Sequence, residues 1–235
     1  MRTLVIGDIH GGLKGLTQLL DTAEVTIEDT LIFVGDYVDG WSESAQVIQY
    51  LINLSKTNNC VFIKGNHDVW CEDWLRTGEG DSVWLEHGGK ATVESYFGFS
   101  DEEKKQHLYF FNDMSFYHID DENRLFIHAG FTSEEGVEKE YNFRNFYFDR
   151  TLWESAINKN AIDKRFSNYK EIYIGHTPTI NLYVDKPMNA VNVWNIDTGA
   201  AFTGKLSAID IDTKDIFQSD TLKDLYPNEM GRNKL

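Results

Sequence analysis

Five short apolar runs in this 235-residue sequence each end in a motif that carries metal-binding side chains. The run CVFI at residues 60–63 has the composition of a buried strand, and Gly65-Asn66-His67-Asp68 follows it after a single lysine. The same arrangement recurs with the motifs GDIHG at 7–11, GDYVD at 35–39, HAG at 128–130 and GHTP at 175–178. Buried strands seldom end in such residues unless the ends form a site. We therefore expect the chain to fold around these five strand ends.

The order of the expected elements indicates an α/β protein. In the first half of the chain strands alternate with runs of helical apolar spacing, whereas the second half is rich in strands. Strands are expected near residues 2–8, 29–35, 60–64, 114–119, 124–128, 171–175, 181–184, 191–196 and 206–211. A polar turn between the fourth and fifth of these predicts a hairpin. The pattern favours a mixed, partly antiparallel two-sheet core flanked by helices.

Composition supports a single domain over residues 1–235. Apolar residues make up 41% of the chain and aromatic residues 14%, which is enough for a substantial core. Only three prolines occur, and no serine- or glycine-rich run marks a linker between domains. The sequence gives no indication of the oligomeric state.

The net charge restricts the classes of partner. A formal charge of −16 argues against broad binding to nucleic acid or to an anionic membrane. It does not exclude a small phosphorylated substrate, because bound cations reverse the local sign of the charge. The chain enters a predicted strand directly, and no apolar stretch is long enough for a signal peptide or a membrane span. The expected location is the cytoplasm.

Together the five motifs supply ligands for two divalent cations. Asp8 and His10 are two residues apart in an expected turn, so that both can reach one ion. Asp36 comes from a neighbouring strand end and can bridge two ions. Carboxylate, amide and imidazole donors suit hard or borderline divalent metals. The predicted ligands are Asp8, His10, Asp36, Asn66, His128 and His176.

Such a pair of ions predicts hydrolysis of a phosphoester. Two cations about 3.5–4 Å apart clamp a phosphoryl group and lower the pKa of a bridging water, so that hydroxide attacks in line. The leaving oxygen then needs a proton. His67 directly follows a predicted ligand, and we expect it to be the general acid, with Asp39 orienting its ring. The alternative is that His67 only supports the neighbouring ligands.

In this order and at these spacings, the motifs resemble those of the calcineurin-like metallophosphoesterases over nearly the whole chain. The chain looks most similar to the bacterial and phage form of the serine/threonine phosphoprotein phosphatase branch. The likeness extends to Trp84-x-x-x-Gly88-Gly89 and to Ile196-Asp197-Thr198-Gly199-Ala200. Thr177-Pro178 also fits this branch, because many phosphodiesterase branches carry Gly-His-x-His at that point.

The resemblance implies a fold, a division of the ligands and a metal. The implied fold is a β-sandwich flanked by helices. The implied first metal is held by Asp8, His10 and Asp36, and the second by a set that shares the bridging aspartate, namely Asp36, Asn66, His128 and His176. Mn²⁺ is the usual ion in bacterial members, and Fe or Zn are alternatives.

The residues that would bind phosphate depart from the family pattern. The pattern reads Gly-Asp-x-Val-Asp-Arg-Gly, whereas Gly40-Trp41 stands here in place of Arg-Gly. Lys64 replaces the arginine that precedes Gly-Asn-His, and Arg150 lies upstream of Leu152-Trp153 where the family has an arginine downstream. Neither lysine nor glycine reproduces the bidentate fork of arginine. The predicted substrate-binding residues are Lys64, Trp41 and Arg150.

Aromatic residues stand where arginines are expected. Trp41 falls beside the expected mouth of the site, and Trp70 and Trp74 follow the central motif. One interpretation is an aromatic rim that stacks on a nucleobase, an aryl group or a sugar ring. The other is that these side chains pack in the interior.

The expected function is hydrolysis of phosphomonoesters, as in a serine/threonine protein phosphatase. One alternative is a nucleotide phosphoanhydride hydrolase of the diadenosine-tetraphosphatase type. A second is a non-catalytic metal-binding interaction protein. For the enzymes, the expected partner is a phosphoprotein, a small phosphoester or a nucleotide, with no nucleic-acid polymer and no membrane.

Overall fold

The computed structural model describes residues 2–159 and 162–233. Within these ranges the strands are β1 (Thr3–Ile6), β2 (Thr30–Phe33), β3 (Asn59–Phe62), β4 (Tyr117–Ile119), β5 (Arg124–Ile127), β6 (Glu171–Ile174), β7 (Met188–Ala190), β8 (Val193–Asn195), β9 (Lys205–Asp210) and β10 (Ile216–Thr221). The α-helices are α1 (Leu13–Thr22), α2 (Ser44–Leu54), α3 (Asn66–Thr77), α4 (Ser82–Trp84), α5 (Lys90–Ser95), α6 (Asp101–Asp113), α7 (Asn145–Phe148), α8 (Thr151–Ile157) and α9 (Leu222–Leu225).

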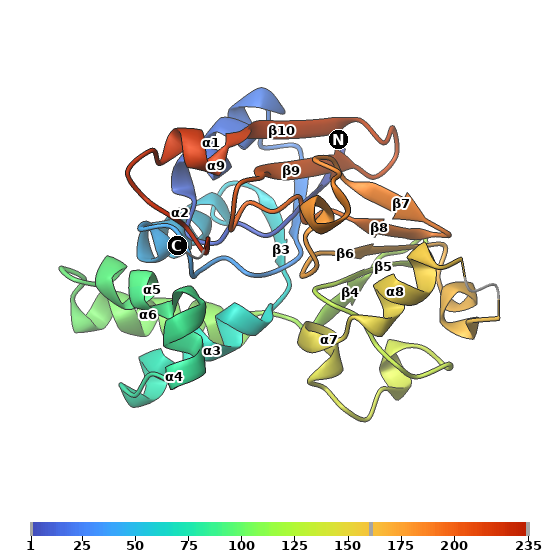
Figure 1. Cartoon of the computed structure of the whole chain (residues 1–235), viewed down its shortest axis with the longest axis horizontal. Helices are drawn as coiled ribbons and strands as arrows, with labels where there is room; N and C mark the ends of the chain where they lie inside the picture. The colour runs from blue at the N-terminus through green and yellow to red at the C-terminus, as the bar shows by residue number, and fades with distance from the viewer. Residues whose placement is uncertain (1, 160–161, 234–235) are drawn as a thin grey trace.

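The strands form two mixed sheets of five strands each, with helices on their outer sides (Figure 1). The first has the order β10-β9-β1-β2-β3, in which β1, β2 and β3 are parallel and β9 runs antiparallel to both its neighbours. The second has the order β4-β5-β6-β8-β7, in which β5, β6 and β8 are parallel and the edge strands are antiparallel. The predicted α/β fold with a mixed two-sheet core is confirmed, including the hairpin of β4 and β5.

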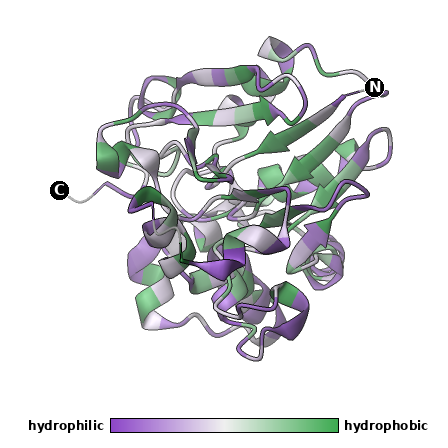
Figure 2. Ribbon diagram, turned by 90° about the vertical axis from the view of Figure 1, so that its right-hand side faces the viewer, coloured by the Kyte–Doolittle hydropathy of each residue, from purple (hydrophilic) through white to green (hydrophobic). Residues whose placement is uncertain are grey.

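The two sheets face each other through an apolar layer. Val5 belongs to this layer, whereas its neighbours Leu4 and Ile6 belong to a separate cluster with residues of the helices. This alternation arises because successive side chains of a strand point to opposite faces of the sheet. Figure 2 shows hydrophobic residues along several central strands. The inter-sheet cluster contains residues of both sheets, namely Val5, Ile32, Val34, Phe126, Tyr173, Ile196, Ile209 and Ile211. Because apolar layers cover both faces, the parallel strands read as continuous apolar runs in the sequence.

Three parts of the second half differ from the expectation. The strand expected at 181–184 is absent, and a 3₁₀ turn spans Thr179–Leu182 instead. Tyr183 has a positive φ of 60°, which a strand does not accommodate, and the Thr179 hydroxyl donates to the Val184 carbonyl (2.8 Å) to close the turn. Strands β7 and β10 were not expected, because β7 has only three residues and the sequence IFQSDT of β10 lacks an apolar alternation.

No helix within residues 2–159 and 162–233 is both long and apolar enough to cross a membrane. The single domain over residues 1–235 stays a prediction. Residues 1, 160–161 and 234–235 of that range lie outside the described part of the chain.

A buried histidine on α6 should make the fold sensitive to acid. His107 is fully buried between the Tyr96 hydroxyl (2.9 Å from Nδ1) and Gln49 Oε1 (3.3 Å from Nε2). Burial lowers the pKa of His107 to about 4, against 6.5 for an unperturbed histidine. The unfolded chain therefore takes up this proton first, so the contribution to stability is complete above about pH 6.5 and is lost as the pH falls toward 4.

We expect the free energy of unfolding to lose about 2–3 kcal/mol through this one group between pH 7 and pH 4. Urea unfolding of the parent and of His107→Gln at several pH values would measure it. The variant should lose less stability than the parent over this interval. Parallel pH profiles for the two proteins would contradict the assignment.

Candidate active site

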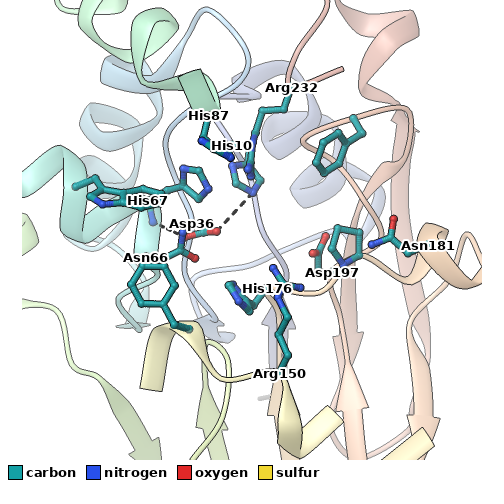
Figure 3. A pocket seen from close by; sticks show the side chains of 14 residues that line it. His10, Asp36, Asn66, His67, His87, Arg150, His176, Asn181, Asp197 and Arg232 are labelled. Atoms are coloured by element: carbon teal, nitrogen blue, oxygen red, sulfur yellow. Dashed lines mark hydrogen bonds and ion pairs between the residues drawn. The ribbon is translucent and has the colours of Figure 1, made fainter. Parts of the chain in front are cut away.

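A cavity of about 280 Å³ lies at the carboxyl ends of the parallel strands, and side chains that follow β1, β2, β3, β6 and β8 point into it (Figure 3). Both sheets therefore contribute to one site. The residues that line it are His10, Asp36, Asn66, His67, Trp70, His87, Phe148, Arg150, His176, Pro178, Asn181, Asp197, Phe202 and Arg232.

All six predicted metal ligands come together here and are buried. Asp8 and His128 do not line the cavity but lie against residues that do. Asp8 Oδ2 is 3.9 Å from His10 Nε2, and His128 Nε2 is 3.3 Å from Asn66 Oδ1. The ring centroids of His128 and His176 are 5.0 Å apart. That these six residues bind metal ions stays a prediction, and their convergence is the geometric support for it.

Asp36 occupies the centre of the group. Its Oδ2 lies 3.6 Å from His10 Nε2 and 3.4 Å from His128 Nε2, so one oxygen lies between the two halves of the ligand set. Its Oδ1 accepts a hydrogen bond from the backbone N–H of His67 (3.0 Å), in the first turn of α3. This position suits a carboxylate that bridges two ions.

Backbone carbonyls set the orientation of two imidazoles. His10 Nδ1 lies 3.1 Å from the Val38 carbonyl and 2.9 Å from the Asp39 carbonyl, and His128 Nδ1 lies 2.8 Å from the Val34 carbonyl. A carbonyl only accepts, so Nδ1 carries the proton in both rings. The lone pair of each Nε2 is then directed toward Asp36, which is the arrangement of metal-binding histidines.

The electrostatics of the site fit bound cations. Burial raises the pKa of Asp8 well above its usual range, and the negative charges of Asp197 and Asp36 add to the effect. Asp8 Oδ2 accepts from the His176 backbone N–H (3.0 Å), whereas Asp8 Oδ1 and His176 Nε2 are buried with no hydrogen-bond partner among the described residues. Crowded carboxylates and unpartnered donor atoms of mixed oxygen and nitrogen type suit borderline divalent ions.

Among the residues that the structure describes, two three-residue groups have donor atoms within 4.8 Å of one another: His10, Asp36 and His67, and Asp36, His128 and His176. The first contains His67 in place of the expected Asp8. We favour Asp8 as the ligand, because its Oδ1 has no other partner whereas His67 Nδ1 is held by Asp39 at 2.6 Å.

Two motif glycines are explained by the approach of the carboxylates. A Cβ at Gly65 would lie 2.1 Å from Asp36 Oδ1, and a Cβ at Gly175 would lie 2.1 Å from Asp8 Oδ1. Any other residue at either position would displace the carboxylate of a predicted ligand. These two glycines therefore allow each carboxylate to lie against the backbone of a neighbouring strand end.

The backbone of the site is strained. Four site residues have positive φ values although none is glycine: His10 (52°), Asp36 (55°), Asp39 (73°) and His176 (68°). Such conformations are uncommon outside glycine and persist where the surroundings impose them. The Asp68 carboxylate imposes part of it, since it accepts the backbone N–H groups of Asp36 (2.8 Å), Tyr37 (2.9 Å) and Gly65 (2.8 Å).

His67 and Asp39 form the pair expected for proton transfer. Asp39 is fully buried, and its carboxylate also accepts from Trp84 Nε1 (2.6 Å) and Thr92 Oγ1 (2.5 Å). Burial lowers the pKa of His67 to about 3, and the negative charge of Asp36 opposes this. Burial raises the pKa of Asp39 to about 8, and the bonds from Thr92 and Trp84 oppose that. With Nδ1 held by Asp39, His67 has Nε2 available for the cavity that it lines.

The structure corrects two of the three predicted substrate-binding residues. Trp41 is 0% exposed: its Nε1 donates to the Ala200 carbonyl (2.7 Å) and its ring stacks on Tyr226, so it cannot reach a substrate. Lys64 is buried, ion-paired with Glu72 (2.6 Å) and not part of the lining of the cavity. Arg150 lines the cavity as predicted.

Of the other predicted rim residues, Trp70 lines the cavity, with its ring centroid 5.1 Å from that of His67. Trp74 packs against Trp84 and Tyr96, which agrees with the packing interpretation of this residue rather than with the rim. Sequence reasoning gave no role to Asp197 or Arg232, which both line the cavity. The motif IDTGA could have indicated a role for Asp197, whereas no sequence motif contains Arg232.

The fold and the arrangement of donors define a class, the hydrolases that act with two neighbouring metal ions. The chain belongs to the calcineurin-like phosphoesterase family, whose sequence profile matches residues 1–202. It is therefore a metallophosphoesterase, a metal-dependent phosphoester hydrolase of a family that normally binds two divalent metals. The resemblance to this family that was noted in the sequence is confirmed.

Curated relatives of similar length carry the name asymmetrical bis(5'-nucleosyl)-tetraphosphatase PrpE. The protein of Anoxybacillus flavithermus is 30% identical over 226 residues, which cover 87% of this chain and 88% of that protein. The protein of Oceanobacillus iheyensis is 28% identical over 227 residues, which cover 88% of each.

Solved structures share the fold at lower identity. A structure proposed to be that of a diadenosine tetraphosphatase has a TM-score of 0.65 at 19% identity and covers 92% of both chains. A protein serine/threonine phosphatase of Saccharomyces cerevisiae has a TM-score of 0.63 at 13% identity, covering 94% of this chain and 80% of that one. At these identities the likeness concerns the fold alone.

Proposed function

We propose that this chain hydrolyses a phosphoanhydride bond of a nucleotide, as a dinucleoside tetraphosphatase does. The observation that carries the proposal is the similarity to proteins of that name over 87–88% of the chain, at 28–30% identity. The lining of the cavity supports it. Arg150 and Arg232 offer positive charge for several phosphates, and Trp70, Phe148 and Phe202 offer aromatic surface for a base.

The residues of the site have distinct tasks in this reaction. Two divalent cations bound here, which we propose to be Mn²⁺, would supply positive charge for the phosphoryl oxygens and an acidified water. The carbonyl-bound rings of His10 and His128 and the central Asp36 fix the donor atoms before any substrate arrives. Because the pKa of His67 is lowered and that of Asp39 is raised, the shared proton rests on Asp39 near neutral pH. Neutral His67 gives its Nε2 proton to the leaving oxygen while its Nδ1 takes up the proton of Asp39 across the 2.6 Å contact.

Substrate preference tests the proposal. Initial rates with Mn²⁺ should be measured on diadenosine tetraphosphate, 4-nitrophenyl phosphate and a serine phosphopeptide, with the nucleotide products separated by ion exchange. We expect kcat/KM to be highest on the tetraphosphate, with AMP and ATP as unequal products. A higher kcat/KM on the phosphopeptide would instead favour the phosphomonoesterase that the sequence first suggested.

For the partner and the location of the protein, we propose what the sequence analysis led us to expect. The partner is a soluble phosphorylated nucleotide, and the location is the cytoplasm. A non-catalytic role would require that no phosphoester or anhydride turns over with both metals bound.

A further inference from the structure

Arg232 reaches the cavity from a part of the chain that the family profile does not cover, since the matched region ends at residue 202. Its backbone N–H donates to the Ala201 carbonyl (2.8 Å), and its guanidinium carbon lies 5.3 Å from the centre of the Phe202 ring. In Figure 3 its side chain extends toward His10, and Arg150 extends from the opposite side near His176. The two cationic side chains thus lie on either side of the metal-binding residues.

Among the described residues neither arginine forms an ion pair, although the charge of Arg232 opposes, from a longer distance, the rise in the pKa of Asp39 and Asp197 that their burial causes. Within the described residues Arg150 donates to Thr177 Oγ1 (3.0 Å), and no carboxylate lies within ion-pair distance of Arg150 or Arg232. The buried arginines Arg124 and Arg165, by contrast, are each paired with aspartates. In a chain of net charge −16, two unpaired guanidinium groups at one cavity indicate a site for anions.

Contacts with Trp41 and Ser42 hold in place the C-terminal segment Tyr226–Asn233, which carries Arg232. Glu229 accepts from both the backbone N–H (3.0 Å) and the hydroxyl (2.8 Å) of Ser42, and the Trp41 ring stacks on Tyr226 with centroids 5.2 Å apart. A Cβ at Gly231 would lie 2.7 Å from the Trp41 ring, so this contact is close. The buried Trp41 therefore helps to anchor the segment that carries Arg232.

The backbone at Gly40 lies close to both His10 and Arg232, and a Cβ there would lie 3.2 Å from the His10 carbonyl oxygen. A Cβ at position 40 would lie 3.3 Å from Arg232 Cγ. Beyond Arg232 the cavity adjoins a second one of about 550 Å³, which shares His87, Phe202 and Arg232 in its lining. A substrate longer than a single phosphate can therefore extend past this side chain.

We propose that Arg232 binds a phosphate next to the one that is attacked, and that with Arg150 it selects substrates that carry more than one phosphate. The ligand class is a nucleoside oligophosphate. This inference deepens the proposed function and rests on it. It also assigns the C-terminal segment Tyr226–Asn233 as a part of the substrate site.

The test compares Arg232→Gln with the parent on diadenosine tetraphosphate and 4-nitrophenyl phosphate at fixed free Mn²⁺. We expect kcat/KM to fall about 10- to 100-fold on the tetraphosphate, chiefly through KM, because a charge-assisted hydrogen bond is lost. The change on the monoester should be less than about 3-fold, because this substrate has no second phosphate. Arg232→Lys should recover part of the loss, since it restores the charge but not the fork. Lys105→Gln on the exposed side of α6 is the control for the net charge.

Equal changes on the two substrates, or no change on the tetraphosphate, would overturn the assignment. If the parent hydrolyses only the monoester, the proposed function fails, but Arg232 is still tested. Diadenosine tetraphosphate would then be used as a competitive inhibitor of monoester hydrolysis. A higher inhibition constant for Arg232→Gln supports the role of Arg232, and an unchanged constant overturns it.

Discussion

Replacing His67 with asparagine should lower kcat by about 10²- to 10⁴-fold, the usual contribution of a positioned general acid. His67 Nδ1 is held by Asp39 at 2.6 Å, and the ring lines the cavity beside His10, with centroids 5.0 Å apart. Asparagine is smaller and has no titratable nitrogen, so the proton for the leaving oxygen would have to come from water. Steady-state kinetics with saturating Mn²⁺ would measure the loss.

The loss should depend on the leaving group. A 4-nitrophenolate leaves without much help, whereas an alkoxide needs the proton, so His67→Asn should impair an alkyl phosphate at least about tenfold more than 4-nitrophenyl phosphate. The metal content should stay at that of the parent. Equal impairment of both substrates would show that His67 only positions its neighbours, and loss of one ion would show that it is a ligand. His118→Asn, on strand β4 away from the cavity, is the matched control.

Sequence reasoning located the site because its ligands lie at strand ends. Apolar runs such as CVFI predict strands, and the carboxyl ends of parallel strands share an edge, so the motifs that follow them are expected to converge. This reason covers the four candidate ligands at the ends of β1, β2 and β3 and, separately, the two at the ends of β5 and β6, because the two sets belong to different sheets. The packing of the two sheets against each other, which no single motif predicts, brings all six together. The motifs also include Gly65 and Gly175, but the sequence alone does not explain why these positions are glycine. The structure does, because a Cβ at either position would lie 2.1 Å from a carboxylate oxygen, of Asp36 and of Asp8 respectively.

The substrate side of the cavity could not be predicted in the same way. Lys64 was expected to bind phosphate from its position beside the central motif, but its side chain turns to Glu72 on α3. Trp41 was expected at the mouth, but its indole turns inward to the Ala200 carbonyl and Tyr226. Arg232 arrives from the other end of the chain through tertiary contacts. The direction of a side chain at a loop position depends on such tertiary contacts, and these cannot be predicted from the spacing of residues in the sequence.

The two halves of the metal centre should respond differently to the loss of a carboxylate. Asp36 lies between His10 and His128, so Asp36→Asn should abolish the binding of both ions and lower kcat by at least about 10³-fold. In the predicted division of the ligands Asp8 serves one half only, so we expect Asp8→Asn to retain about one ion per chain. Elemental analysis after desalting would measure the stoichiometry. Asp73→Asn, an exposed carboxylate on α3, is the control for charge. Two ions retained by Asp36→Asn would refute the bridging role.

Metal should reverse the effect of Asp8→Asn on stability: we expect the variant to be more stable than the parent without metal and less stable with it. Without metal, Asp8 is a buried carboxylate whose Oδ1 has no partner and whose neighbours include Asp36 and Asp197, so Asp8→Asn should raise the free energy of unfolding by about 1–2 kcal/mol. With Mn²⁺ at about 100 times its dissociation constant, each ion stabilises the parent by about 2.7 kcal/mol, and the variant forgoes one of them. Urea unfolding with chelator and with Mn²⁺ should therefore reverse the order of the two proteins. A variant that is less stable under both conditions would show that Asp8 supports the fold, and would remove the main electrostatic reason for placing a cation beside it.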